Sequence, residues 1–351
     1  MTTQTRLELA QLLAEDPRKA LELTGKSRTV ALISNGGQIP ELGPTTPQAA
    51  LPYLEDQALL IQKLTNLRAW PLAINAATPE DLATFVTLLA PSCGVLCLDS
   101  LGDETYQAAE RILTPLGLPV FFHPQQSRPI LALAALLQGL ALTNRELSKA
   151  RIVLAGFEAD SLAMVDYLLA AGATDLMICD RSGLIHKGRS GPTSWLKEQL
   201  AQKTNPQQIR GGLNKALSGA DAYISRATPM SLTKDVVNMM AHRPIILNFS
   251  QALLPPGPFT TANLPLGLGV GPGPATRLTS HLLTPLVLSG LFAGVLKARV
   301  SSITSSMKLA VTKALNELID QTDAGQFLPP TSHPRLVESV ANRVVEATQN
   351  P

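Results

Sequence analysis

The feature that most constrains the fold of this chain is a repeated alternation of apolar, β-branched segments with amphipathic segments. Its clearest unit is RIVLAGFEADSLAMVDYLLAAGATDLMICD, residues 151–180, in which two apolar segments flank a helical pattern and the second ends in an acid. Parallel strands need a crossover of a dozen or more residues, which a helix supplies. The alternation therefore predicts an α/β protein built on parallel sheets.

The alternation occurs twice along the chain, so we expect two α/β units. In the first we predict strands at 29–34, 70–75, 94–99 and 118–123, and helices within 46–65 and 78–90. In the second we predict strands at 151–156, 176–180, 222–225 and 244–250, and helices at 160–171, 195–203, 213–219 and 232–241. The 78–90 segment has Thr at the cap and Pro at the first helical position, a strong helix start.

The rest of the chain supplies a central helix, a loop and a helical end. Residues 129–142 are apolar nearly all round and too short to span a bilayer, so we expect a buried helix that bridges two domains. Residues 253–277 are rich in Pro and Gly and predict a loop. Helices are expected in 282–300, 305–320 and 334–349. The domain ranges expected from these patterns are 1–125, 126–305 and 306–351.

Composition limits the classes of partner. Charged residues make up 16% of the chain, against about 25% in typical soluble domains, so part of the surface is expected to be buried in a homo-oligomer such as a homodimer. The net charge is only +2 and the sequence contains no dense basic run, so we expect neither nucleic acid nor an anionic membrane as a partner. The first residues lack the features of a signal peptide and no run of 18 apolar residues occurs, which predicts a cytoplasmic protein.

The three cysteines favour a structural role. Cys93, Cys97 and Cys179 each lie in an apolar run that reads as a strand or its entry. Small buried thiols belong in such places. The spacing of the first two could suit a metal pair, but no second Cys or His pair accompanies them. We therefore interpret all three as core thiols.

Three segments carry a resemblance to a known family. They are LTGKSRTVALISNGGQIPELGPTTPQAALP at 23–52, CDRSGLIHKGR at 179–189 and GLFAGVLKARVSSITSSMKLA at 290–310. In this order they resemble the malic enzyme family, the decarboxylating malate dehydrogenases, from about Leu21 to Ala310. The resemblance implies a malic-enzyme-type N-terminal α/β domain, a Rossmann-like domain of the NAD-binding type and C-terminal helices. Function is a separate question, because it depends on particular side chains.

The metal ligands implied by the resemblance are mostly missing. Oxidative decarboxylation of malate needs a divalent cation held by hard oxygen ligands. In the family these come from a Glu-Asp pair at a strand end and from a later Asp-Asp pair. Here the pairs read Leu98-Asp99 and His123-Pro124, so only Asp99 remains as a weak metal ligand. We therefore expect no divalent cation, and we interpret Asp99 as a strand-end residue that caps a turn.

The acid–base groups implied by the resemblance are also missing. The family lysine follows a Glu-Gly pair after AALP, and this chain reads AALPYLEDQALL, which places Gln57 at the lysine position. A carboxamide has no accessible proton equilibrium near neutral pH. The family tyrosine precedes the first matching segment, and neither Tyr53 nor Tyr106 lies in the corresponding place. No catalytic residue is therefore assigned.

The cofactor turn keeps one glycine of three. A G-x-G-x-x-G turn uses its glycines for the bend, for the approach of the pyrophosphate and for close helix packing. Here these positions read Gly156, Glu158 and Ser161, so the bend is kept and a carboxylate stands where the pyrophosphate would approach. Asp180 suits a ribose diol but could equally cap a turn. NAD or NADP is thus expected to bind weakly or not at all, chiefly because of Glu158.

Further departures occur where the family contacts substrate and nicotinamide. The family Asn-Pro falls at Gln251-Ala252, and the paired asparagines fall near Leu283 and Thr284. Losses at base, metal, substrate and phosphate positions together predict a catalytically inactive protein with a regulatory, scaffolding or partner-binding role.

Two alternatives remain open. One is a divergent oxidoreductase of the decarboxylating malate dehydrogenase type that uses NAD or NADP, with Asp99, His123 or Lys26 as its base. The other is a metabolite sensor in which Arg128 and His123, in FFHPQQSRP, bind an anion. The competing interpretation of these two residues is an exposed loop that enters a helix.

Overall fold

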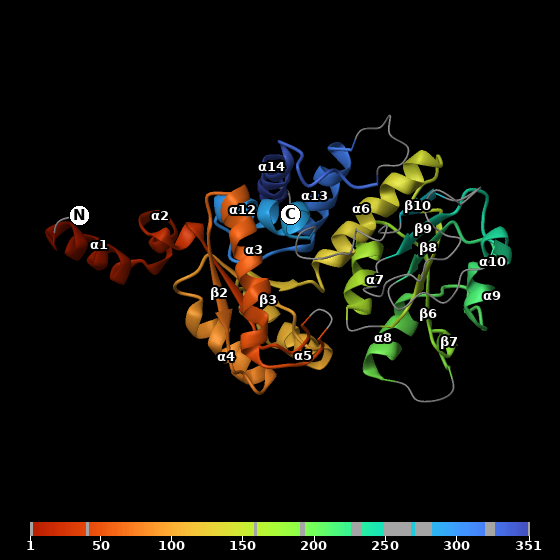
Figure 1. The fold of residues 1–351 in the computed structure, drawn as a ribbon, viewed down its shortest axis with the longest axis horizontal. Helices are drawn as coiled ribbons and strands as arrows, with labels where there is room; N and C mark the ends of the chain where they lie inside the picture. Colours follow the sequence, from red (N-terminus) through yellow and green to blue (C-terminus); the bar gives the residue numbers. More distant parts are fainter. Residues whose placement is uncertain are drawn as a thin grey trace. The chain divides into compact units, whose positions relative to one another are not determined.

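A computed structural model gives the fold of the chain (Figure 1). The structure describes residues 3–39, 42–157, 160–189, 194–225, 234–248, 268–270, 283–319 and 327–349. The chain forms two compact units, of which the first comprises Met1–Pro124, Thr284–Val311 and Val337–Pro351, and the second comprises Gln125–Leu283 and Thr312–Leu336. Both units are therefore discontinuous in sequence, whereas the three expected domain ranges are continuous.

The first unit contains a four-stranded parallel sheet in the order β2-β1-β3-β4. Its strands are β1 (Thr29–Ser34), β2 (Arg68–Ala73), β3 (Val95–Asp99) and β4 (Val120–His123). Each matches a predicted strand with its ends shifted by at most two residues. The two central strands β1 and β3 are buried along their whole length, as expected for parallel strands covered on both faces.

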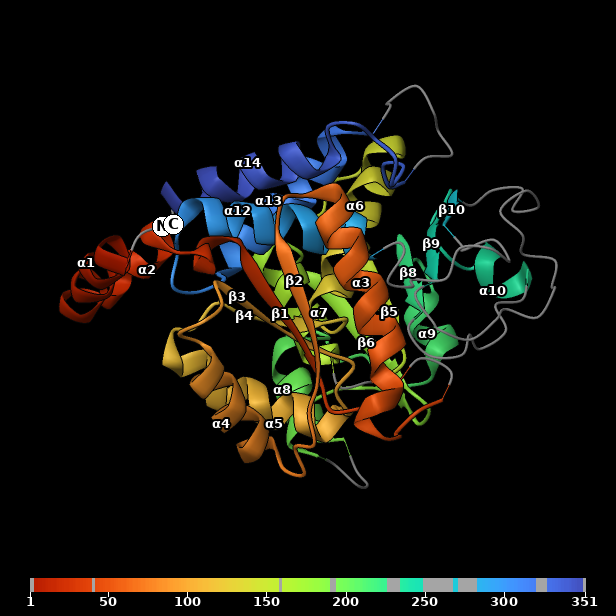
Figure 2. The same ribbon diagram turned by 60° about the vertical axis from the view of Figure 1, so that its left-hand side comes forward.

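Helices cover both faces of this sheet (Figure 2). Neighbouring residues of a strand point to opposite faces. Phe122 of β4 packs edge-on against Tyr106 of α5 (Asp103–Leu113), with ring centroids 5.4 Å apart. Phe121 packs against Phe292 of α12 (Ser289–Ala298), at 5.8 Å. Helix α5 therefore covers one face of the sheet and α12 the other.

The other helices of the first unit begin in different ways. Helix α4 (Pro79–Leu89) starts with a capping box in which Thr78 and Asp81 exchange hydrogen bonds, as its sequence predicts. Helix α3 (Leu51–Leu64) follows a short 3₁₀ turn and buries one apolar side, together with the polar Gln57. The short helix α2 (Ala20–Leu23) precedes β1.

The C-terminal part of the chain is helical, as predicted. It forms a π-helical turn (Thr284–Leu288), α12, α13 (Ser305–Glu317) and α14 (Leu336–Gln349). Two glycines of α12 allow it to approach α14 closely. A Cβ on Gly290 would lie 2.5 Å from the Cβ of Val340, and one on Gly294 would lie 2.6 Å from the Cβ of Val344. The returning segments thus belong to the first unit because α12 packs on its sheet and α14 packs on α12.

The second unit contains a six-stranded sheet in the order β10-β9-β8-β5-β6-β7. Its strands are β5 (Arg151–Ala155), β6 (Asp175–Asp180), β7 (Gly183–Leu184), β8 (Ala222–Ser225), β9 (Ile245–Asn248) and β10 (Leu268–Val270). All pairings are parallel except that of β7 with β6. The chain runs from β5 to β6 on one side and later returns to β8 on the other. In sheets of this Rossmann-like kind, ligands bind where the strand order reverses in this way.

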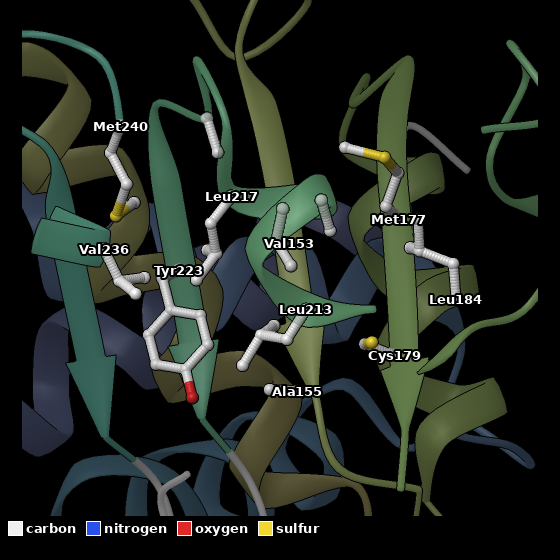
Figure 3. Packing of buried hydrophobic residues seen from close by; sticks show 12 residues of the cluster. Val153, Ala155, Met177, Cys179, Leu184, Leu213, Leu217, Tyr223, Val236 and Met240 are labelled. Atoms are coloured by element: carbon white, nitrogen blue, oxygen red, sulfur yellow. The ribbon is translucent and has the colours of Figure 1, made fainter. Parts of the chain in front are cut away.

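One face of the second sheet is covered by apolar residues of the segments 213–220 and 236–240 (Figure 3). Alternate residues of neighbouring strands, including Val153, Met177 and Tyr223, point to this face and are almost fully buried. Leu213 and Leu217 of α9 (Leu213–Leu217) pack onto them, and α10 (Lys234–Asn238) adds Val236. The other helices of this unit are α6 (Ser127–Leu142), α7 (Ser161–Ala170) and α8 (Trp195–Lys203).

The predicted α/β class and Rossmann-like second sheet are confirmed, with local differences. Helix α6 is buried along most of its length as predicted, and it lies in the second unit, where Gly139 approaches Ile245 of β9. Within the predicted loop 253–277, β10 forms an edge strand; the rest of that segment lies outside the described residues. The sequence analysis did not predict α1 (Thr3–Glu15), α5 or β7. No helix among the described residues has both the length and the apolar character needed to cross a membrane.

Candidate functional site

The candidate site of the first unit lies at the carboxyl end of β3 and centres on Asp99. The residue is 2% exposed, and both of its carboxylate oxygens accept hydrogen bonds from side chains. Gln57 of α3 donates from Nε2 to Asp99 Oδ2 at 2.7 Å. The Ser100 hydroxyl donates to Asp99 Oδ1. Asp99 ends a strand as predicted, but it serves as the centre of a buried polar cluster rather than as a turn cap.

Ser100 is a member of this cluster that the sequence analysis missed. It adopts φ 51°, a left-handed conformation uncommon for residues other than glycine, and it is 7% exposed. This conformation turns the chain sharply at the end of β3, and the Ser100 hydroxyl lies against the preceding carboxylate. The signal available in the sequence was only a hydroxyl next to a strand-end acid, which is too common to decide anything.

His123 reaches the same cluster from the neighbouring strand. It pairs in register with Asp99, and its Nε2 lies 3.8 Å from Asp99 Oδ2. The backbone amide of Ser100 donates to the His123 carbonyl at 3.0 Å, which ties the two strand ends together. The His123 side chain is 4% exposed. The interpretation of this segment as an exposed loop is therefore wrong for His123, because β4 continues to this residue and buries it.

The residues present do not fit a divalent cation. Asp99 is the one carboxylate at the expected position, and hydrogen bonds from the chain engage both of its oxygens. Leu98 is fully buried in β3, and Pro124 has a hydrocarbon side chain. The described residues contain no group of three His, Cys, Asp or Glu side chains able to hold a metal ion. A hard cation needs several oxygen ligands, so this cluster is built as a hydrogen-bonded unit.

Lys26, another candidate base, lies away from the cluster. It belongs to the 3₁₀ turn Gly25–Arg28, and its carbonyl lies against Gly94, just before β3 begins. Asp99 stands at the opposite end of that strand. Burial lowers the pKa of Lys26 and raises the pKa of the neighbouring Cys93 to about 11. This pair is therefore not part of the Asp99 cluster.

The second candidate site is the cofactor turn after β5. Gly156 adopts φ 109° and donates its amide to the Cys179 carbonyl at 3.0 Å, so the sharp bend predicted for the first motif glycine is present. Ser161 begins α7 and is fully buried, which shows that the fold accommodates a hydroxymethyl group at the third motif position. Glu158 lies outside the described residues, and so do Gln251 and Ala252. Leu283 and Thr284 are both buried.

Asp180 is held by basic side chains from its own unit. It accepts hydrogen bonds from Arg189 at 2.7 Å and from the Ser182 amide at 2.8 Å, and Lys197 lies 2.9 Å from its other oxygen. Burial acts to raise the pKa of Asp180, but the hydrogen bonds from Arg189 and Lys197 outweigh it and leave the pKa below its ordinary value. A ribose diol at Asp180 would have to compete with these partners. The cations Arg189 and Lys197 were missed by the sequence analysis.

Arg128 is also committed to a partner in its own unit. Its Nη1 lies 4.0 Å from an oxygen of Asp160, the residue before α7, and the two side chains are 11% and 2% exposed. Arg128 lies in the first turn of α6, not in an exposed loop, because the helix begins at Ser127. Asp160 therefore places a negative side chain just before the start of α7. Phosphate groups are commonly bound at such helix starts.

Comparison with known proteins identifies the family. No family model matches the chain. The chain is 30% identical over 338 residues to the NAD-dependent malic enzyme of Geobacillus stearothermophilus, and the match covers 95% of this chain and 70% of that protein. This chain belongs to the malic enzyme family. It is also 28% identical to the bifunctional malic/malolactic enzyme of Bacillus subtilis, over 95% of this chain and 82% of that protein.

Solved structures agree with this assignment. The malic enzyme from Pyrococcus horikoshii superposes with a TM-score of 0.88 at 26% identity, over 99% of this chain and 83% of that one. The NAD-dependent malic enzyme from Thermotoga maritima gives 0.87 at 25% identity, over 98% and 91%. The family resemblance inferred from three short segments is therefore confirmed across nearly the whole chain.

Proposed function

We propose that this member of the malic enzyme family lacks oxidative decarboxylation activity and has a regulatory, scaffolding or partner-binding role. One observation carries the proposal: the Gln57 carboxamide donates to Asp99 in a buried cluster whose other carboxylate oxygen is held by Ser100. A buried carboxylate satisfied by neutral donors is stable without a cation. Gln57 also stands at the position of the family lysine, and its carboxamide cannot exchange a proton near neutral pH.

The proposal extends to the cofactors. The relatives are named as NAD-dependent or NADP-dependent malic enzymes, so either dinucleotide is a candidate ligand for this chain. Against tight binding stand the paired Asp180, the Arg128–Asp160 pair before α7 and the sequence position of Glu158. A dinucleotide needs free hydrogen-bond donors for its phosphates. The basic side chains near Asp180 and Asp160 are already paired with these acids, and Glu158 adds a negative charge. We propose that neither NAD nor NADP binds with micromolar affinity.

The alternative function is a divergent NAD(P)-dependent oxidoreductase. Two observations favour it: the His123 imidazole lies 3.8 Å from the Asp99 carboxylate, and the Gly156 bend with its β5-α7-β6 unit is intact. Such an imidazole could take a proton from a substrate hydroxyl. The sensor alternative is weaker, because Arg128 and His123 already have acidic neighbours.

A direct assay separates these functions. The purified protein is incubated with malate, Mn²⁺ and NAD or NADP, and reduced cofactor is followed by absorbance. We expect no reduction above background, because loss of a proton-transfer group alone typically lowers rates by about 10²–10⁴. Turnover near one per second, abolished by His123→Gln, would establish the alternative instead.

Calorimetry tests the two binding steps separately. Mn²⁺ titrated into the wild type should give no saturable heat, and micromolar binding that disappears in Asp99→Asn would overturn our assignment of the cluster. NAD titrated into the wild type and into the double variant Glu158→Gly with Ser161→Gly tests the turn. Affinity that appears only in the double variant supports a turn blocked by its own carboxylate.

A further inference from the structure

Two basic side chains of the second unit converge on one acid, Asp180 at the carboxyl end of β6. Arg189 Nη2 donates to Asp180 Oδ1 at 2.7 Å, and Lys197 Nζ lies 2.9 Å from Asp180 Oδ2. The Asp180 side chain is 7% exposed, whereas those of Arg189 and Lys197 are 21% and 27% exposed. This cluster therefore carries a net positive charge, and its cations are the part that solvent reaches.

The local fold places Lys197 beside the turn after β5. Ser194 caps α8, and its hydroxyl accepts from the Lys197 amide at 3.4 Å, so Lys197 lies in the first turn of this helix. The helix start adds partial positive charge to that of the ammonium group. Lys197 Nζ also lies 5.1 Å from the ring centroid of Phe157, the residue after the Gly156 bend. Lys197 thus contacts both the turn after β5 and the end of β6, where Rossmann-like sheets bind the ribose of a dinucleotide.

A ribose diol fits Asp180 poorly in this setting. Its two hydroxyls would need acceptor oxygens, but Asp180 Oδ1 already accepts from Arg189 and, at 2.8 Å, from the Ser182 amide. Lys197 lies against the other oxygen. Hydrogen bonds from charged donors are stronger than those from neutral hydroxyls, so the diol would compete weakly with these partners.

The same cations keep donors that Asp180 does not use. An ammonium group has three N–H donors and a guanidinium group has five, and Asp180 offers them two oxygens. Arg189 Nη1 is enclosed and has no hydrogen-bond partner among the described residues. Enclosed polar groups normally have a partner, so this nitrogen indicates an acceptor that the described part of the chain does not supply.

We propose that the cluster of Asp180, Arg189 and Lys197 binds a phosphate monoester in place of a ribose diol. One phosphate oxygen would accept from Arg189 Nη1 and another from Lys197 Nζ, while both cations keep their contacts with Asp180. The phosphate is attracted by two cations and repelled by one carboxylate, so the net interaction is favourable. Two sources share this chemistry: free inorganic phosphate, and a nucleoside phosphorylated on its ribose, such as the adenosine 2′-phosphate part of NADP.

This inference deepens the proposed function and rests on it for one point, the exclusion of a dinucleotide's pyrophosphate by Glu158. Adenosine 2′-phosphate has no pyrophosphate, so it can reach the cluster without meeting that carboxylate. Its binding requires no catalysis. A failure of the inference therefore leaves the proposed inactivity unaffected, and the malate assay tests that inactivity separately.

Isothermal titration calorimetry on the full chain tests the inference with adenosine 2′-phosphate, adenosine and inorganic phosphate. We expect adenosine 2′-phosphate to bind at least about tenfold more tightly than adenosine, because only the phosphate engages both cations. Inorganic phosphate that binds as tightly as the nucleotide would identify the free ion as the ligand, whereas tighter binding of the nucleotide would identify a ribose phosphate. Adenosine that binds as tightly as its 2′-phosphate would overturn the inference, and so would the absence of saturable heat with both phosphate probes at millimolar concentration.

Variants that remove one charge locate the site. Lys197→Met and Arg189→Met keep an apolar side chain and should each weaken the binding of adenosine 2′-phosphate about tenfold. Lys203→Met is the matched control, because Lys203 belongs to the same helix and pairs with Asp166 at 2.6 Å. Lys197→Arg keeps the charge and should bind nearly as the wild type does, which separates loss of a contact from loss of the fold. Equal binding by Lys197→Met and Lys203→Met would refute the assignment of the site.

Discussion

At the scale of single residues, Asp99 is the centre of a buried cluster of hydrogen-bonded side chains. A carboxylate buried to 2% exposure would be very unfavourable without donors, and Gln57, Ser100 and His123 surround it. Gln57 is itself 2% exposed, and its Nε2 donates across from α3 to β3. The amide therefore contributes to the stability of the first unit.

The first prediction concerns this amide. Gln57→Leu removes the donor to Asp99 and leaves a buried carboxylate oxygen short of a partner, so the free energy of unfolding should fall by about 1–3 kcal/mol. Urea denaturation followed by circular dichroism measures it. Gln62→Leu on the same helix is the matched control, because Gln62 is exposed and its bond to the Ala69 carbonyl is longer, at 3.3 Å. Equal effects of the two substitutions would contradict the prediction.

The second prediction concerns the pH dependence of stability. The pKa of Lys308 is about 8 in the folded state, below its ordinary value of 10.5, so the unfolded state binds more protons between these pH values. Stability must then rise with pH across that window through this group. Lys308→Met should flatten the rise measured by urea denaturation from pH 7.5 to 9.5. An unchanged slope would show that the ammonium is better solvated than the structure indicates.

At the scale of elements, the C-terminal helices complete the first unit through small residues. Helix α12 presents Gly290 and Gly294 to α14, one helical turn apart. The four-residue spacing places both glycines on the same side of the helix, so the backbones can approach closely along that line. A residue larger than glycine at either position would place at least a methyl group between α12 and α14.

The third prediction tests that contact. In Gly294→Ala the new Cβ would lie 2.6 Å from the Val344 Cβ and 2.8 Å from the Ala341 carbonyl oxygen, so the helices must shift. We expect a loss of about 1–3 kcal/mol from overpacking, despite the better helix propensity of alanine. Gly25→Ala is the control, because its Cβ would meet only the end of the Arg68 side chain, at 3.7 Å. A thermal melt in which Gly294→Ala matches the wild type would refute the close packing.

At the scale of the whole molecule, the low charge fraction predicts an assembly. Helix α1 buries none of its residues, and Leu7 and Leu12 are 53% and 39% exposed. Apolar side chains in a helix without tertiary cover favour contact with another chain. We therefore propose a homodimer in which α1 contributes to the interface.

The fourth prediction follows from this proposal. Light scattering coupled to size exclusion at micromolar concentration should give the mass of a dimer, and Leu7→Lys with Leu12→Lys should shift it toward the monomer. The double substitution should leave the circular dichroism of the monomer unchanged, because both side chains are exposed within the chain. A wild type that is monomeric at this concentration would refute the proposal.

The sequence by itself determined the α/β class, nearly all strands and the malic enzyme family, because buried parallel strands leave continuous apolar runs that local patterns reveal. It did not predict α5, whose ends lack a strong cap signal, or the return of α12 and α14 to the first unit. At the two candidate sites, the sequence identified Gln57, Asp99 and Gly156 as positions of interest. Only the tertiary structure showed that Gln57 donates to Asp99 and that Arg189 and Lys197 pair with Asp180. The physical reason is that contacts between residues apart in sequence depend on how the helices pack on each sheet.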